Sequence, residues 1–200
     1  ILTKNEERNI EYWLSSLNNF NQVLILDSYS TDRTIQIAKN FDVVIYKRIF
    51  KNYGDQRNYA LNKLPFINKW ILFIDADEMV TPELESEIRN KVLLKNNING
   101  YYINRKIFFN NKYLKHSNAF PNWNIRLFKK DAGVVYKDKI NEHPIFDMPK
   151  IGFVKNGYLL HKNRNENIHF LNKHQRYAKL EAERLKEQRI NKQLFFNCFL

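Results

Sequence analysis

The stretch Trp70-Ile-Leu-Phe-Ile-Asp-Ala-Asp-Glu78 decides the fold of this chain. Its apolar residues run directly into Asp75 and Asp77, which predicts a buried strand with both carboxylates at its carboxyl end. In an open α/β sheet that edge binds ligands. Side chains two residues apart on an extended strand point the same way, so we expect Asp75 and Asp77 to converge on one divalent cation, or on a cation and a sugar. The alternative is a strand-end turn that is simply rich in Asp.

Strand and helix patterns alternate along the first half of the chain. The predicted strands before the Asp-x-Asp stretch are short apolar runs at residues 1–3, 23–26 and 43–45. The predicted helices lie at about 5–17, 30–38, 55–61 and 81–94. This βαβαβαβ order implies right-handed crossovers and a mainly parallel sheet with helices on both faces.

The second half of the chain has a different character. Residues 100 to about 158 favour strands, which predicts a mixed or antiparallel sheet, and one hairpin is expected to turn at Asn110-Asn111. A long charged helix is predicted from residue 166 to about 192. We therefore expect one domain over residues 1–165, with halves at 1–95 and 96–165, and a helical extension at 166–200.

Composition indicates a packed globular protein that attracts anions. Hydrophobic residues make up 44% and aromatic residues 14% of the 200 residues, and no apolar run approaches the roughly 18 residues of a membrane span. The 33 basic and 21 acidic residues give a formal charge of +12, which attracts nucleic acid, anionic membranes or phosphorylated glycolipids. No zinc-finger, RNP-type or leucine-zipper pattern is visible, so nucleic acid is not expected as a partner. The single cysteine, Cys198, excludes an internal disulfide framework and fits a reducing cytosolic setting.

Three motifs together resemble family 2 glycosyltransferases of the GT-A fold. They are Thr3-Lys-Asn-Glu-Glu-Arg-Asn-Ile10, Leu26-Asp-Ser-Tyr-Ser-Thr-Asp-Arg-Thr34 and Phe73-Ile-Asp-Ala-Asp-Glu78, in the family's order and spacing. Three further segments, Asp55-Gln-Arg-Asn-Tyr-Ala-Leu61, Asn141-Glu-His-Pro144 and His161, resemble the branch that builds lipopolysaccharide or lipooligosaccharide cores. The resemblance covers about residues 1–180. It implies a Rossmann-like GT-A sheet, with residues 1–95 as the nucleotide-sugar-binding half and residues 96–165 as the acceptor-side half.

The resemblance implies a donor site along the strand ends. Thr3 and Asp27 would bind the nucleoside, with Asp27 accepting a hydrogen bond from a base N–H, as the family's equivalent does with uracil. Many family members have two successive Asp residues here, whereas this chain has Asp27-Ser28, which leaves the choice of a uridine nucleotide open. The alternative role of Asp27 is to cap the following helix.

The resemblance makes Asp77 the favoured ligand of a divalent cation, Mg²⁺ or Mn²⁺, which would act as a Lewis acid on the departing diphosphate. Asp75 would share the metal or contact ribose and sugar hydroxyls. Glu78 is expected only to cap the next helix.

Four further residues are candidates for the diphosphate. Arg57 can clamp phosphate oxygens in a bidentate way, and Gln56 or Asn58 would share this role. The alternative is a solvated helix face. His161 falls where related enzymes place a residue near the diphosphate, which implies contact with metal or phosphate; a structural histidine is the alternative.

An inverting transfer needs a base on the acceptor side. Glu142 matches the family's acidic base by position in the chain. Relatives often show His-Glu where this chain shows Glu-His, so the role can shift to His143. Asp138 and Asp147 are nearby rivals, and a surface ion pair with a lysine is the alternative role of Glu142.

Two more residues are expected to line the acceptor side. Trp123 offers a flat ring that packs on a sugar face, and Arg126 offers a guanidinium for an acceptor phosphate. Trp123 is equally compatible with a place in the core.

The resemblance as a whole implies an inverting, metal-dependent transfer of a hexose, glucose in the first instance, from a UDP-linked sugar to a glycolipid or polysaccharide. The nearest relatives are expected to be bacterial β-1,4-glucosyltransferases that act on inner-core heptose at the cytoplasmic face of the membrane. A basic nucleic-acid- or membrane-binding module on an inactive GT-A-like fold is one alternative. A sugar-phosphate nucleotidyltransferase is another, but residues 3–7 lack the Gly-rich loop that such enzymes carry.

Overall fold

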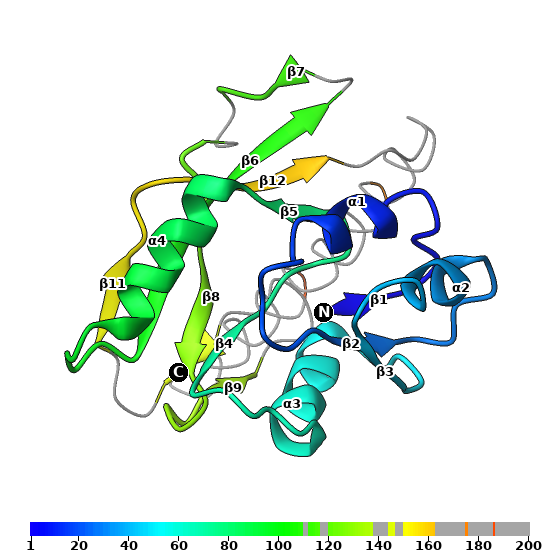
Figure 1. Ribbon diagram of the computed structural model, residues 1–200, viewed down its shortest axis with the longest axis horizontal. Helices are drawn as coiled ribbons and strands as arrows, with labels where there is room; N and C mark the ends of the chain where they lie inside the picture. Colours follow the sequence, from blue (N-terminus) through cyan, green and yellow to red (C-terminus); the bar gives the residue numbers. More distant parts are fainter. Residues whose placement is uncertain are drawn as a thin grey trace, which may run out of the picture. The chain divides into compact units, whose positions relative to one another are not determined.

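The computed structural model describes residues 1–109, 112–116, 120–137, 144–146, 150–162, 175 and 186. The chain divides into two compact units, Ile1–Asn163 and Arg164–Leu200, and every element described below lies in the first (Figure 1). The helices of this unit are α1 (Ile10–Ser15), α2 (Thr34–Ala38), α3 (Tyr53–Lys63) and α4 (Pro82–Leu93). Its strands are β1 (Leu2–Thr3), β2 (Leu24–Asp27), β3 (Val44–Lys47), β4 (Trp70–Leu72), β5 (Glu78–Val80), β6 (Gly100–Phe109), β7 (Lys112–Tyr113), β8 (Trp123–Lys129), β9 (Val135–Tyr136), β10 (Pro144–Ile145), β11 (Ile151–Phe153) and β12 (Leu159–Lys162).

The amino-terminal half forms a parallel sheet in the order β1-β2-β3. Thr3 pairs with Asp27, and Asp27 pairs with Lys47. The ends of all three strands therefore meet at one edge, as the βαβ pattern predicts. This parallel arrangement is confirmed.

The Asp-x-Asp segment joins this sheet differently from the prediction. The regular strand β4 ends at Leu72 and pairs antiparallel with β8, and the only link to the parallel sheet among the described residues is a bridge between Leu2 and Asp75. The segment therefore meets β1 in the predicted parallel direction at Asp75, but its regular strand stops at Leu72, before Asp75, and its other neighbour β8 runs antiparallel. Its apolar residues match a buried strand of either direction, because periodicity does not report the pairing partner.

The second half builds a mixed sheet in the order β4-β8-β6-β12-β5, with β11 and β7 also paired to β6. The long strand β6 pairs antiparallel with β8 over its first half and parallel with β12 over its second half. The predicted hairpin is confirmed by the antiparallel pairing of β6 and β7, although its turn at Asn110-Asn111 lies outside the described residues.

Helices cover both faces of these sheets, as predicted. One apolar cluster packs α1, α2 and α4 against the sheets, and Figure 1 shows α4 between β11 and β8. Its members are Ile10, Trp13, Leu14, Leu17, Ile25, Ala38, Ile74, Ala76, Val80, Leu84, Ile88, Tyr101, Ile103, Leu127, Val154 and Leu159. A second cluster packs α3 against the opposite face through Leu24, Leu26, Ala60, Leu64, Ile71, Phe73, Phe128, Ala132, Tyr136 and Phe146. Burial of these side chains, at about 25 cal/mol per Å² of apolar surface, is the main term that stabilises the strand-end edge.

Helix ends follow local sequence signals. The Thr81 hydroxyl accepts the Leu84 N–H at 3.3 Å, and Pro82 occupies the first turn of α4. Asn52 caps α3 by accepting the Asp55 N–H at 2.8 Å. Gln175 and Lys186, the two described residues within the predicted carboxy-terminal helix, are helical, while its other residues and the boundary near residue 165 lie outside the described set. No described helix has the length and apolar character to cross a membrane.

Candidate functional site

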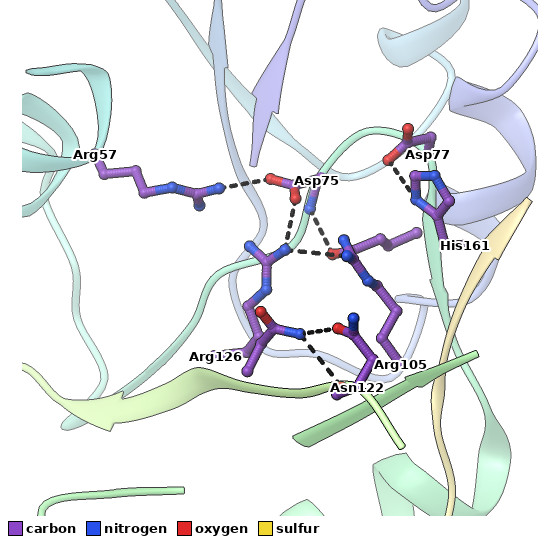
Figure 2. A network of polar contacts seen from close by, with 9 residues as sticks. Arg57, Asp75, Asp77, Arg105, Asn122, Arg126 and His161 are labelled. Carbon is purple, nitrogen blue, oxygen red and sulfur yellow. Dashed lines mark hydrogen bonds and ion pairs between the residues drawn. The ribbon is translucent and has the colours of Figure 1, made fainter. Parts of the chain in front are cut away.

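The segment between β4 and β5 forms a turn at the ligand edge of the sheet. Ala76 and Asp77 occupy this turn, which is closed by a hydrogen bond from the Glu78 N–H to the Asp75 carbonyl at 3.0 Å. The segment is not extended here, so the alternation rule that predicted a common direction for Asp75 and Asp77 does not apply. The two carboxylates contact different partners (Figure 2).

Asp75 lies between two arginines. Its Oδ1 accepts from Nη2 of Arg57 at 2.7 Å, and its Oδ2 accepts from Nη2 of Arg126 at 2.6 Å. Burial raises the pKa of Asp75, but the charges and hydrogen bonds of Arg126 and Arg57 outweigh it, and the pKa lies well below its usual range. Both oxygens of Asp75 are thus occupied, which differs from the predicted role as a metal ligand.

Glu78 is the buried centre of the network. Its side chain is 0% exposed, and Oε1 accepts from Arg126 Nη2 at 3.0 Å and from Arg105 Nη1 at 3.3 Å. Its Oε2 accepts the Asp75 N–H at 3.0 Å. Glu78 is the first residue of β5, and the residue that caps α4 is Thr81. The prediction that Glu78 only caps the next helix is therefore wrong.

A β-bulge places Arg126 in this network. Tyr101 of β6 pairs with Leu127, whereas Tyr102 pairs with Ile125, so Arg126 is the extra residue of β8. A bulge redirects the side chain of its extra residue. Asp75 and Glu78 overcome the effect of burial and raise the pKa of the Arg126 guanidinium above its ordinary value. Arg126 was predicted on the acceptor side, and the structure instead places it against the Asp-x-Asp turn.

Arg57 lies within the protein with only 5% of its side chain exposed. Its guanidinium carbon lies 5.5 Å from the ring centre of Phe73 and 5.6 Å from that of Tyr136. This position between two rings adds cation–π attraction to the ion pair with Asp75. In the described structure Arg57 thus contacts Asp75, and its predicted role as a clamp on the diphosphate stays a prediction.

The two neighbours of Arg57 are also engaged internally. Gln56 is fully buried, donates to the Ser28 hydroxyl at 3.1 Å and accepts from Arg48 at 2.9 Å. Asn58 exchanges two hydrogen bonds, at 2.7 and 2.9 Å, with the backbone of Tyr136. Both side chains tie α3 to neighbouring strands, which differs from the predicted contact with phosphates.

Asp77 and His161 form a second pair beside the network. Oδ1 of Asp77 lies 3.2 Å from Nδ1 of His161, which is carried by β12 (Figure 2). The imidazole N–H does not point well at this oxygen, and Nδ1 is buried with no directed hydrogen bond to any described residue. We therefore treat the contact as an ion pair. Burial lowers the pKa of His161, but Asp77, with a smaller effect of Glu78, raises it above its ordinary value.

The predicted nucleoside residues lie at the ends of β1 and β2. Asp27 is fully buried and accepts the N–H and the hydroxyl of Ser30 at 2.8 and 2.5 Å. The Thr3 carbonyl accepts the Ser28 N–H at 2.9 Å, while the buried Thr3 hydroxyl has no hydrogen-bond partner within the described structure. The turn role of Asp27 is thus present in the structure, and a role in reading a base remains a prediction.

The acceptor side is described only in part. Trp123 is 37% exposed and meets the ring of Phe153 edge to face at 5.2 Å, so it is not a core residue. The predicted base Glu142, its neighbour His143 and the rivals Asp138 and Asp147 lie outside the described residues.

The sequence that builds this site matches a known protein family. Residues 1–148 match the sequence model described as "Glycosyl transferase family 2". The chain belongs to glycosyl transferase family 2. The resemblance read from the three motifs is thereby confirmed.

Relatives of this family member include a glycosyltransferase of Rickettsia typhi, 37% identical over 89 residues that span 44% of this chain and 30% of the relative. The chain thus matches about a third of the length of that relative. The lipopolysaccharide core biosynthesis glycosyltransferase LpsC of Rhizobium meliloti is 22% identical over 188 residues, which cover 92% of this chain and 69% of LpsC.

The fold of this family 2 member resembles solved structures. Glucosyl-3-phosphoglycerate synthase from Mycobacterium tuberculosis, in complex with Mn²⁺ and uridine-diphosphate-glucose, superimposes with a TM-score of 0.56. The match covers 90% of this chain and 76% of the synthase at 14% sequence identity. The GT-A architecture predicted from the motifs is therefore confirmed.

Two members of the site were not recognised from the sequence. Arg105 was not considered, and Glu78 was assigned a capping role. Arg105 lies at an alternate position of a strand whose same-face residues Tyr101, Ile103 and Ile107 are apolar, and this interruption of the apolar alternation is the signal that could have found it. No comparable signal exists for Glu78, because its burial depends on strands far away in sequence.

The low pKa of Asp75 predicts how stability depends on pH. A carboxyl whose folded pKa lies below its unfolded value of about 3.9 stabilises the fold above that value and loses this effect as pH falls through the folded pKa. Asp75→Asn should therefore lower the free energy of unfolding by a constant amount from pH 7 to 5, and the gap to the wild type should shrink below about pH 4. Urea unfolding across this range measures the gap, and parallel curves down to pH 2 would contradict the prediction.

Proposed function

We propose that this chain transfers a hexose with inversion from a UDP-linked sugar, UDP-glucose in the first instance, to a glycolipid acceptor such as a lipopolysaccharide core. The observation that carries the proposal is the Asp77–His161 pair beside the Asp75–Glu78–arginine network, at the ligand edge of a GT-A sheet. The complex of the mycobacterial synthase with uridine-diphosphate-glucose and Mn²⁺ supports the choice of donor.

Asp77 and His161 fit a divalent cation. Oδ1 of Asp77 and Nδ1 of His161 lie 3.2 Å apart, which is close enough for both atoms to bind one cation. The buried Nδ1 without a directed hydrogen bond is a free ligand atom once the imidazole is neutral. The described residues contain no group of three or more such ligands, but Mg²⁺ commonly takes one or two protein ligands and completes its shell with water and phosphate. The ion, when bound, supplies Lewis-acid neutralisation of the diphosphate.

The arginine network supplies a fixed positive field beside this pair. Arg57, Arg105 and Arg126 carry three positive charges, and Asp75 and Glu78 carry two negative charges, so the cluster retains one positive charge. A preorganised charge in a partly buried site stabilises an anionic leaving group more strongly than a charge in water. We propose that Asp75 keeps Arg57 and Arg126 in place for this purpose.

Glu142 remains the proposed base. Its carboxylate would take the proton of the acceptor hydroxyl as the hydroxyl oxygen bonds to the anomeric carbon. The bond from that carbon to the phosphate oxygen breaks in the same displacement, and UDP leaves with the electron pair. No covalent intermediate with the protein is needed in an inverting transfer.

The choice of acceptor rests on the net charge of the chain and on its sequence similarity to LpsC. The formal charge of +12 suits an anionic glycolipid, and LpsC is named for lipopolysaccharide core biosynthesis. We propose that the protein works in the cytoplasm, at the inner face of the membrane, with Trp123 packing on an acceptor sugar.

A donor panel tests the proposal. The purified chain is incubated with UDP-glucose, UDP-galactose, UDP-N-acetylglucosamine and GDP-mannose, with Mn²⁺, Mg²⁺ or chelator, and release of nucleoside diphosphate is measured. Metal-dependent release from a UDP-sugar is expected. Binding of polyanions with a steep salt dependence, without binding or turnover of any donor, would instead support a basic binding module.

A further inference from the structure

Tyr29 has an unusual backbone conformation at the ligand edge. Its φ is +57°, in the left-handed region that favours glycine, and its side chain is 52% exposed although it follows the buried Asp27 and Ser28. A bulky residue in this region is strained, and such strain is concentrated at functional sites. Asn5, the other non-glycine residue with positive φ among those described, has a local explanation. Its side-chain carbonyl accepts the Thr31 N–H at 2.8 Å, and Asn tolerates this conformation.

The surrounding loop holds Tyr29 in place. Ser30 donates its N–H and its hydroxyl to Asp27 at 2.8 and 2.5 Å, and the Asn5 N–H donates to the Ser30 hydroxyl at 2.9 Å. The Tyr29 side chain itself has no hydrogen bond or ring contact with any other described residue. The backbone is thus fixed while about half of the residue's surface remains exposed, and no hydrogen bond or ring contact of the side chain with the described residues explains the strain.

The distance of Tyr29 from the Asp-x-Asp turn, along the ligand edge of the sheet, indicates which part of a bound donor Tyr29 would contact. Asp27 pairs with Thr3, and Leu2 of the same strand bridges to Asp75. Two strand spacings of about 4.8 Å therefore separate the end of β2 from the Asp-x-Asp turn, a distance of about 10 Å. A donor whose diphosphate lies at Asp77 would extend its nucleoside towards the end of β2.

We propose that Tyr29 is the platform on which the nucleobase of the donor stacks. The inference rests on the proposed function. A tyrosine ring offers a flat apolar face to a base, and its hydroxyl can remain in water. Tyr29 would therefore strengthen binding of the nucleoside without contacting the phosphates or the transferred sugar.

Binding of UDP in the presence of Mn²⁺, measured by calorimetry, tests the proposal. Tyr29→Ala should raise the Kd for UDP about 10-fold, and Tyr29→Phe should leave it unchanged within about twofold, because stacking needs only the ring. Tyr12→Ala removes a comparably exposed tyrosine, 48% exposed on α1, and should leave the Kd unchanged. Inorganic pyrophosphate, which has no base, should bind wild type and Tyr29→Ala equally.

A second variant separates function from folding. Tyr29→Gly relieves the backbone strain, so its Tm should rise by about 2 °C while its Kd for UDP rises as in Tyr29→Ala. Unchanged UDP affinity in Tyr29→Ala, with wild type binding UDP, would overturn this inference and leave the proposed function standing. Failure of the wild-type chain to bind any nucleotide or nucleotide sugar would overturn the proposed function and this inference with it.

Discussion

Asp77→Asn should lower the rate of UDP release by about 100-fold or more. The substitution keeps the size of the side chain but removes the charge that pairs with His161 at 3.2 Å and, in the proposed function, binds the divalent cation. Lewis-acid neutralisation of a leaving diphosphate contributes several kcal/mol, and each 1.4 kcal/mol corresponds to about tenfold in rate. The measurement is UDP release from the donor identified in the panel, together with Mn²⁺ affinity by calorimetry.

Asp42→Asn is the matched control, because Asp42 is exposed and lies away from the strand-end site. It should leave turnover and Mn²⁺ affinity at the wild-type level. Circular dichroism should show that both variants are folded. If Asp77→Asn retains full metal-dependent turnover, Asp77 is not a ligand of the cation and the proposed metal site is wrong.

Glu78→Gln should destabilise the protein by about 3 kcal/mol or more. Glu78 is fully buried and balances Arg105 and Arg126, so the substitution leaves the buried guanidinium of Arg126 and the partly buried one of Arg105 short of a counter-charge. The new amide NH₂ also faces N–H donors in place of a carboxylate oxygen. Removing one partner of a buried ion pair commonly costs about 3–5 kcal/mol. Urea unfolding at pH 7 gives the change in free energy directly.

Glu85→Gln supplies the comparison for this substitution. Glu85, which is 18% exposed, pairs with the exposed Arg89 at 2.9 Å along α4, where water and salt reach the pair from the Arg89 side. Its loss should cost less than about 1 kcal/mol. Equal effects of Glu78→Gln and Glu85→Gln would show that the buried network contributes no more than a surface pair.

Local patterns in the sequence were sufficient to predict the parallel strands β1 to β3, the helices α1 to α4 and the family. Val23–Leu26 and the residues after Thr81 carry their own strand and cap signals, which depend on neighbours a few residues away. The roles of single side chains were harder to predict. Arg57 and Gln56 were expected to face phosphates, and both are buried, because helix periodicity shows a common face but not what covers it.

The sequence by itself determined that this chain is a GT-A member of glycosyl transferase family 2, and that Asp75, Asp77 and His161 belong to its strand-end edge. Only the tertiary structure decided how the carboxylates divide, with Asp75 and Glu78 held by three arginines and Asp77 beside His161. The physical reason is that these contacts join β5, β6, β8 and β12, which are distant in sequence. A turn at residues 76–77 and a bulge at Arg126 set the directions of the side chains, and neither leaves a local signal in the sequence.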